Sequence, residues 1–242
     1  KATFDKQSGL LVSYRYKKQE YIHNGQGPRP FFWRAPTDND YGAKLPVRLK
    51  AWKEASYQEP KAESFNVVRD KDTTAVKVTY RFPQTDARWD ITYKVYGNGV
   101  IKVDNHFVAE NAQTPMIPRV GLRMRLPARI TSLTYYGRGP EENYRDRRTS
   151  QFIGEYTSGI QDMYEPYVRP QENNHRTDIY WCTLTSKAKE GLLFVADRTF
   201  EMNVSNYPLE SLDSGESIEN GSPRTEKTNH RHLTNPQPEP SV

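Results

Sequence analysis

The residues best suited to chemistry stand in one short stretch, FFWRAPTDNDYG, which begins at Phe31. Asp38, Asn39 and Asp40 could hold a cation or bond the hydroxyls of a ligand, because carboxylate and amide oxygens bind both. The oxygen-bearing residues lack the spacing of an EF-hand calcium loop. A turn in which Asp and Asn bond their own backbone accounts for the same residues, so both interpretations stay open.

A second stretch, YYGRGPEENYRDRRTS, contains the adjacent acids Glu141 and Glu142. Two carboxylates that flank one bond are the pattern of glycoside hydrolysis, but adjacent residues of an extended chain point apart. Arginines also crowd the stretch, at Arg138, Arg145, Arg147 and Arg148. Pairing with arginine keeps a carboxylate ionised, so the pattern favours a structural ion-pair network over general acid catalysis.

A third stretch, DMYEPYVRPQENNHRTD, combines tyrosines with acids and amides at Tyr164, Tyr167, Glu172 and Asn173. Such a mixture can line a sugar site, where rings stack on the sugar and polar groups bond its hydroxyls, or it can close a domain interface. His175 could act as a general base, but no Ser or Cys nucleophile stands in a known motif nearby.

Other catalytic and metal-binding patterns are weak or absent. His230 and His232 lie two residues apart, and two ligands do not make a zinc site. The sequence contains no GxGxxG before a helix, no P-loop, no GxSxG and no CxxC. We therefore predict no catalytic residue and no metal site in this chain.

The elements that must position these residues are strands. Apolar and polar residues alternate in four segments, which predicts strands with one buried and one exposed face. The apolar sets are Val76, Val78, Tyr80 and Phe82; Trp89, Ile91, Tyr93 and Val95; Ile101, Val103, Asn105 and Phe107; and Val120, Leu122, Met124 and Leu126. Turn signals at 97–99 and 189–191 suit antiparallel connections. The pattern predicts an all-β chain, a large sandwich of antiparallel sheets.

Several segments depart from the strand pattern. Only Arg48 to Ala55 has a helical pattern, of two turns at most, and residues 135–176 are expected to be irregular. Residues 213–228 are interpreted as a surface loop and 234–242 as a frayed tail. The single cysteine, Cys182, is expected to be buried in a strand as a small hydrophobic residue.

Charge and hydropathy exclude some functions. The net charge is +5, but 35 Lys and Arg are interspersed with 30 Asp and Glu, so we predict no nucleic-acid partner. No apolar run approaches the roughly 20 residues of a membrane-spanning helix, so we predict no membrane partner. At 242 residues the chain is long enough to bury a core and could form one large all-β domain or two small ones, of which we expect one domain.

The three stretches occur in an order that resembles a known family. Together with HRHL downstream, they are similar to the C-terminal domain of the large bacterial β-galactosidases of glycoside hydrolase family 2. The resemblance runs from FDKQSGLL to HRHL and implies a single antiparallel β-supersandwich of the galactose-mutarotase-like type over residues 1–242. It also implies a fragment of a larger multidomain enzyme that is truncated at its C-terminus.

The resemblance further implies how the chain would function. In the family, the acid/base and nucleophile glutamates lie on a separate TIM-barrel domain, so this fragment alone is expected to be inactive. The segment Gly42 to Lys50 would correspond to a mobile loop near the galactose site. Phe31, Phe32 and Trp33 would form a buried anchor, while a polar rim that includes Arg34 would meet the barrel and its sugar pocket.

These considerations give one principal hypothesis and one alternative. The principal hypothesis is a domain that borders the active site and binds carbohydrate in an enzyme hydrolysing terminal non-reducing β-D-galactose residues. Its partners would be the β-galactoside and the other domains of the parent chain, with a homo-oligomer left open. No cofactor is expected in this domain, although the parent could require Mg or Na, and a bacterial cytoplasmic or periplasmic location stays open. The alternative is a free-standing carbohydrate-binding or aldose-epimerase-like domain.

Overall fold

The computed structural model describes residues 1–111 and 115–213. Chain contacts divide the protein into two compact units. The first comprises residues 1–33 and 44–124, and the second comprises residues 34–43 and 125–242, of which the structure describes 125–213. The residues from 214 onward, which include the predicted surface loop, the frayed tail, His230 and His232, lie outside the described part.

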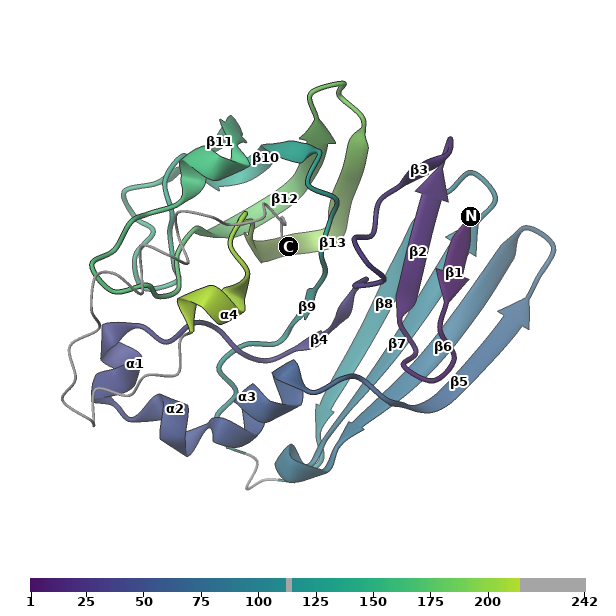
Figure 1. Ribbon diagram of the computed structural model, residues 1–242, viewed down its shortest axis with the longest axis horizontal. Coiled ribbons are helices and arrows are strands. Elements are labelled where there is room, and N and C mark those ends of the chain that lie inside the picture. Colours follow the sequence, from purple (N-terminus) through teal and green to yellow (C-terminus); the bar gives the residue numbers. More distant parts are fainter. Residues whose placement is uncertain (112–114, 214–242) are drawn as a thin grey trace. The chain divides into compact units, whose positions relative to one another are not determined.

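The first unit is built on a four-stranded antiparallel sheet in the order β5-β6-β7-β8 (Figure 1). Its strands are β5 (Ala62–Arg69), β6 (Thr73–Phe82), β7 (Ala87–Tyr96) and β8 (Ile101–Ala109). A smaller sheet contains β1 (Ala2–Phe4), β2 (Leu11–Tyr16) and β3 (Gln19–Glu20), and a separate pair contains β4 (Arg29–Phe31) and β9 (Gly121–Arg123). The remaining elements are α2 (Leu45–Arg48), α3 (Lys50–Tyr57) and a 3-10 turn, η1 (Pro83–Thr85).

The core of the first unit follows the predicted alternation. The side chains of Val76, Val78 and Tyr80 in β6 are buried, as are those of Trp89, Ile91 and Tyr93 in β7. The register pairs Val78 with Ile91 and Tyr80 with Trp89, which places the two apolar rows on the same face of the sheet. The predicted turn after β7 is confirmed, since Gly99 has φ +96° and its N–H donates to the carbonyl of Tyr96 at 3.0 Å.

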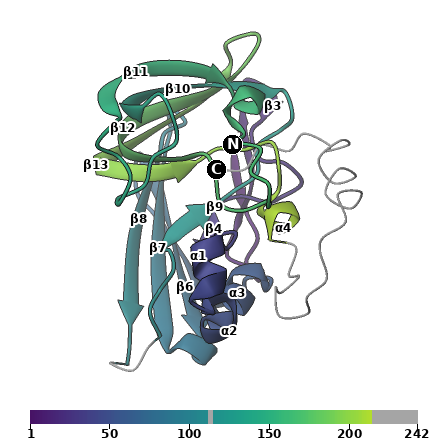
Figure 2. The same cartoon turned by 90° about the vertical axis from the view of Figure 1, so that its left-hand side faces the viewer.

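The second unit is built on a four-stranded antiparallel sheet in the order β11-β10-β12-β13 (Figures 1 and 2). Its strands are β10 (Ile130–Gly139), β11 (Phe152–Gly159), β12 (His175–Ser186) and β13 (Gly191–Asn203). Short elements complete the unit: α1 (Asp38–Gly42), a 3-10 turn η2 (Ile160–Met163) and α4 (Leu209–Leu212).

The buried face of the second sheet carries Leu133 and Tyr135 of β10 beside Leu184 and Cys182 of β12. Cys182 is 1% exposed, which confirms its predicted burial in a strand, and burial raises the pKa of its thiol to about 12. The predicted turn at 189–191 also joins two strands, because the N–H of Ser186 donates to the carbonyl of Glu190 at 2.8 Å.

The antiparallel β class is confirmed, whereas three local predictions are wrong. Two of the four predicted apolar rows are not buried throughout, because Asn105 of β8 and Val120 before β9 are exposed. The segment expected to be irregular contains the end of β10 and all of β11, so only 140–151 and 164–174 lack long regular elements. β11 was missed because its sequence, FIGEYTSG, carries glycines and does not alternate. Helix is also more extensive than expected: α3 matches the predicted helix to within two residues, but α1, α2 and α4 were not predicted.

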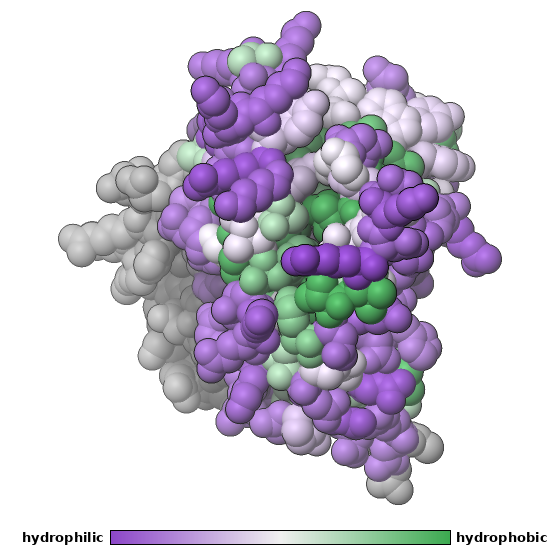
Figure 3. All heavy atoms as spheres, turned by 90° about the vertical axis from the view of Figure 1, so that its right-hand side faces the viewer, coloured by the Kyte–Doolittle hydropathy of each residue, from purple (hydrophilic) through white to green (hydrophobic). Residues whose placement is uncertain are grey.

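The surface combines both charge signs with some apolar side chains. On the face drawn in Figure 3, hydrophilic side chains predominate and enclose a limited hydrophobic area. Among the described residues, no helix is long and apolar enough to cross a membrane. The prediction that residues 1–242 act as one domain stays a prediction.

Candidate functional site

The candidate site begins with the segment that leads into α1. Thr37 caps this helix: the N–H of Asp40 donates to Thr37 Oγ1 at 3.2 Å, and the N–H of Thr37 donates to Asp40 Oδ2 at 3.0 Å. Arg34 then donates to both oxygens of Asp40, from Nε at 3.1 Å and from Nη2 at 2.7 Å. Burial lowers the pKa of Arg34, but the hydrogen bond and charge of Asp40 outweigh burial and raise it overall. Asp40 is therefore both a helix cap and the counter-ion of Arg34.

The neighbouring residues of α1 face outward. Asp38 keeps 67% of its side chain exposed and accepts a hydrogen bond from Arg169 Nη1 at 2.9 Å. The guanidinium of Arg169 also lies over the ring of Tyr41, 4.1 Å from its centroid. Asn39 is exposed. The exposed edge of α1 thus presents a carboxylate, an amide and a ring covered by an arginine.

A second contact joins the same region to the segment before β12. The N–H of Glu172 donates to the carbonyl of Ala35 at 3.1 Å. Glu172 is 3% exposed, and its Oε1 accepts a hydrogen bond from Asn203 Nδ2 at 2.9 Å. The same Nδ2 donates to the carbonyl of Asn173 at 2.9 Å. The structure therefore brings the segment of α1 together with the segment before β12, and Asp38 is 131 positions away from its partner Arg169.

The two predicted tyrosines are partly buried. The ring of Tyr164 lies 4.6 Å from that of Tyr207, and its hydroxyl is enclosed without a partner in the described part of the chain. The hydroxyl of Tyr167 donates to Glu142 Oε1. The pKa of Tyr167 is raised, first by burial and then by this hydrogen bond. Neither tyrosine presents its full ring to solvent.

Glu142 is held in a structural network, as the sequence indicated. Its Oε1 pairs with Arg147 and accepts from Tyr167, and its Oε2 accepts from the N–H of Asn174 at 2.8 Å. Glu141 is exposed and forms no ion pair among the described residues. The network prediction therefore holds for Glu142 and is wrong for Glu141.

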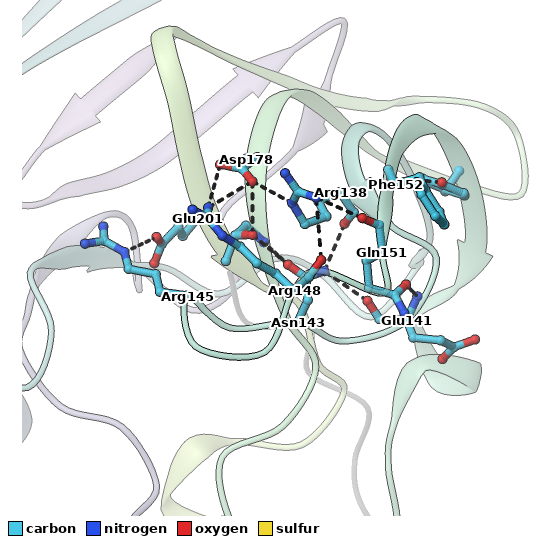
Figure 4. Close-up of polar contacts among 11 residues, drawn as sticks. Arg138, Glu141, Asn143, Arg145, Arg148, Gln151, Phe152, Asp178 and Glu201 are labelled. Carbon is cyan, nitrogen blue, oxygen red and sulfur yellow. Dashed lines mark hydrogen bonds and ion pairs between the residues drawn. The ribbon is translucent and has the colours of Figure 1, made fainter.

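Asp178 forms a second group of ion pairs with arginines (Figure 4). Arg138 Nε donates to Asp178 Oδ2 at 2.7 Å, and Arg148 Nη1 donates to the same oxygen at 3.1 Å. Asn143 lies nearby and is fully buried; its Oδ1 accepts from the N–H and the hydroxyl of Thr177 at 3.0 and 2.6 Å. These bonds fasten the irregular 140–151 segment to the beginning of β12.

A third centre surrounds His175, which is 7% exposed. Its Nε2 lies 3.2 Å from Glu201 Oε2, and its Nδ1 lies 2.8 Å from Asn203 Oδ1. Arg145 Nε donates to the other oxygen of Glu201 at 2.7 Å. The hydrogen bond from His175 is the largest cause that lowers the pKa of Glu201 to about 2, with Arg145 contributing as well. His175 is thus placed as an ion-pair partner of Glu201.

The chemistry available here is binding and positioning. Asp40, Glu142, Asp178 and Glu201 each form an ion pair with arginine, an arrangement that holds a carboxylate in place. In residues 1–111 and 115–213, no three His, Cys, Asp or Glu side chains gather in a way that could hold a metal ion. Sequence reasoning missed Arg169, Asp178, Glu201 and Asn203, because their partners are 26 to 131 positions away.

Comparison with known proteins decides the family. Residues 1–234 match the sequence profile of the family described as Beta galactosidase small chain. The chain belongs to the β-galactosidase small-chain family.

The relatives of this small chain are much longer proteins. It is 33% identical over 235 residues to a β-galactosidase of Priestia megaterium, and the match covers 96% of this chain and 22% of the relative. A β-galactosidase of Lactobacillus delbrueckii subsp. bulgaricus is 35% identical over 207 residues, with 85% and 20% covered. One of Clostridium acetobutylicum is 37% identical over 159 residues, with 65% and 17% covered. The small chain thus spans about a fifth of the length of these relatives, and the family recognised from the three stretches is confirmed.

Proposed function

We propose that this small chain is one domain of a multidomain β-galactosidase that hydrolyses terminal non-reducing β-D-galactose residues. The catalytic glutamates would lie on a TIM-barrel domain in another part of the same parent polypeptide. Relatives about five times longer than this chain support this proposal over a free-standing sugar-binding or epimerase-like domain. The parent would act by the retaining two-step route, which requires two carboxyl groups on either side of the glycosidic bond.

The observation that carries the proposal is the pairing of the buried and half-buried acids described above. A general acid for glycoside hydrolysis needs a raised pKa, and arginine neighbours act in the opposite direction. At Glu201 the hydrogen bonds from His175 and Arg145 lower the pKa to about 2. Hydrolytic chemistry is therefore assigned to the rest of the parent, while this domain supports and borders the active site.

The carbohydrate-facing part of the proposal rests on α1 and the segment before β12. Asp38 and Asn39 are exposed and offer oxygens to sugar hydroxyls, whereas the ring of Tyr41 is covered by Arg169. Arg34, Asp40, Glu172 and Asn173 would hold this rim in place from behind, with Tyr164 and Tyr167 packing the segment that carries Arg169. The neighbouring Gly42 to Lys50 segment contains α2, and its mobility stays a prediction.

An exposed apolar face supports contact with other domains of the parent. On the outer face of the second sheet, Tyr136 pairs with Trp181, which pairs with Val195. Val195 is 66% exposed and the nearby Leu193 is 62% exposed. Aromatic and aliphatic side chains that gather on one sheet face are typical of a surface that another domain covers. A homo-oligomer and a requirement of the parent for Mg or Na stay predictions.

The test compares the small chain with the longer parent on a chromogenic β-galactoside. We expect hydrolysis by the parent and none by the small chain above a boiled control. Titration of the small chain with galactose, followed by tyrosine and tryptophan fluorescence, then tests carbohydrate binding. Asp38→Ala should weaken any binding, whereas Asp104→Ala, at a partly exposed ion-paired acid of the first unit, is the matched control. Repurified small chain that still hydrolyses the substrate would overturn the assignment.

A further inference from the structure

Arg176 is a buried arginine with no carboxylate within ion-pair distance in the described part of the chain. It is the second residue of β12, opposite Met202 of β13, and only 4% of its surface is exposed. Its Nε donates to the hydroxyl of Tyr135 at 3.3 Å, and its Nη1 donates to Asn174 Oδ1 at 3.1 Å and to the carbonyl of His175 at 3.3 Å. All three acceptors are neutral.

Five other arginines of the candidate site do have a carboxylate partner. Each has a carboxylate within ion-pair distance although its side chain is 24% to 82% exposed: Arg34, Arg138, Arg145, Arg147 and Arg148. Arg176 forms no such pair with any residue in 1–111 or 115–213. A guanidinium stays charged at every accessible pH, and a buried charge without a counter-ion is strongly unfavourable. The more deeply buried arginine is thus the one left unbalanced.

Arg176 also retains unused donors. A guanidinium has five N–H groups, and the neutral acceptors take three. Nη2 donates to no acceptor in the described part of the chain, and it is not one of the fully enclosed side-chain atoms that lack a partner. Nη2 therefore keeps some accessible surface, at which an incoming oxygen can contact it.

We propose that Arg176 is a receiving site for a single carboxylate from outside the described chain. One carboxylate balances the charge of one guanidinium and can accept an N–H group of Nη2 in the guanidinium plane. A phosphate dianion would bring excess charge and more oxygens than one free nitrogen can bond. The carboxylate comes either from an Asp or Glu of another part of the parent polypeptide or from a free small carboxylate.

Glu141 is the acid of this chain that could serve as the counter-ion of Arg176 in place of an external carboxylate. Its charge is among the smaller causes that raise the pKa of Tyr135, after burial, so its carboxylate lies near the tyrosine that binds Arg176. Its side chain is nevertheless exposed and points away from the cluster (Figure 4). Its backbone is fixed, since its N–H donates to Gln151 Oε1 at 2.9 Å. A Glu141 variant therefore tests whether the counter-ion of Arg176 is Glu141 or comes from outside the chain.

The experiment titrates the 242-residue chain with sodium acetate against sodium chloride at equal ionic strength and neutral pH, and follows the melting temperature. We expect acetate at about ten times its dissociation constant to raise the melting temperature of the wild type and of Glu141→Gln by about 3–6 °C. Arg176→Met should show no acetate-specific increase and should not melt below the wild type in chloride. Arg176→Gln, which keeps polar contacts and removes the charge, supplies the same comparison if the methionine variant does not fold.

Two results would overturn the proposal. One is an equal acetate response in the wild type and in the variants without the charge. The other is a loss of stability in chloride for Glu141→Gln, which would identify Glu141 as the counter-ion. In the longer parent, a lost acetate response together with destabilisation by Arg176→Met assigns the carboxylate to the parent polypeptide. A response that persists assigns it to a free carboxylate.

Discussion

The two halves of the stretch FFWRAPTDNDYG, which begins at Phe31, are held by different kinds of interaction. Phe31, Phe32 and Trp33 belong to the first unit and are at most 4% exposed, whereas Arg34 to Ala43 belongs to the second unit. The ring of Phe32 lies 4.8 Å from that of Trp52 and contacts further rings at 4.9 to 5.6 Å, of Phe82, Trp89 and Phe107. The polar half instead bonds to Arg169 and Glu172.

One short stretch thus contributes both to stability and to the positioning of polar groups. The aromatic half gains stability from apolar burial, which depends on area and tolerates few gaps. The polar half gains position from charge-assisted hydrogen bonds, which fix angles as well as distances. The unit boundary falls between Trp33 and Arg34, where the two kinds of interaction meet.

The largest effect should come from the aromatic half. Phe32→Ala removes a fully buried ring that contacts four other rings, and we expect a loss of about 3–5 kcal/mol in the free energy of unfolding. Phe32→Leu should cost clearly less because it refills most of the cavity. Urea unfolding followed by tryptophan fluorescence measures both; equal costs would show that ring shape rather than volume decides.

The next effect should come from Asp40. Asp40→Ala removes the carboxylate that accepts from the N–H of Thr37 and leaves Arg34 half-buried without its partner, so we expect a loss of about 2–3 kcal/mol. Asp40→Asn keeps an acceptor for the backbone and should lose less. Thermal unfolding of both variants checks this order. If Asp40→Ala unfolded like the wild type, the polar half would not be held by this residue.

A smaller effect concerns pH. Glu201 has a folded-state pKa of about 2, below its ordinary value of 4.5, so its stabilising contribution is complete above about pH 4.5. That contribution is lost as pH falls through the folded-state pKa. Because 34% of the side chain stays exposed, water screens the pair, and we expect about 1 kcal/mol. Glu201→Gln should flatten stability between pH 5 and about pH 2; an unchanged acid profile would contradict the role of this pair.

The smallest effect on stability should come from Asp38. Its ion pair with Arg169 is exposed, so Asp38→Ala should change the free energy of unfolding by less than about 0.5 kcal/mol. Thermal unfolding beside Asp104→Ala provides the measure. A loss as large as that of Asp40→Ala would mean that Asp38 supports the fold and would remove the distinction between the exposed and buried acids.

Much of the fold could be predicted from local patterns. Alternation predicted β6 and β7 because each strand has one buried face. The glycines of the 97–99 turn predicted the connection from β7 to β8. β11 could not be predicted in this way, since its side chains are largely exposed or half-buried on both faces. The sequence of α1 is five residues long and depends on the cap from Thr37, a signal too short to exclude a simple turn.

The candidate site was predictable in composition and not in pairing. The three polar stretches indicated where acids, amides and arginines would gather. The partners Arg169 for Asp38 and Glu201 for His175 are set by chain topology, which brings together residues 131 and 26 positions apart. The unbalanced charge of Arg176 had no sequence signal, because it depends on which arginine is buried and which acids are already bound.

The most direct test of the account measures turnover and stability together in the longer parent enzyme. Asp38→Ala should lower kcat/KM for a β-galactoside by about tenfold or more, equivalent to about 1.4 kcal/mol of transition-state stabilisation, while the melting temperature stays unchanged. Asp104→Ala should leave both quantities unchanged. Unaltered kinetics for Asp38→Ala would contradict the proposal that the polar edge of α1 borders the active site.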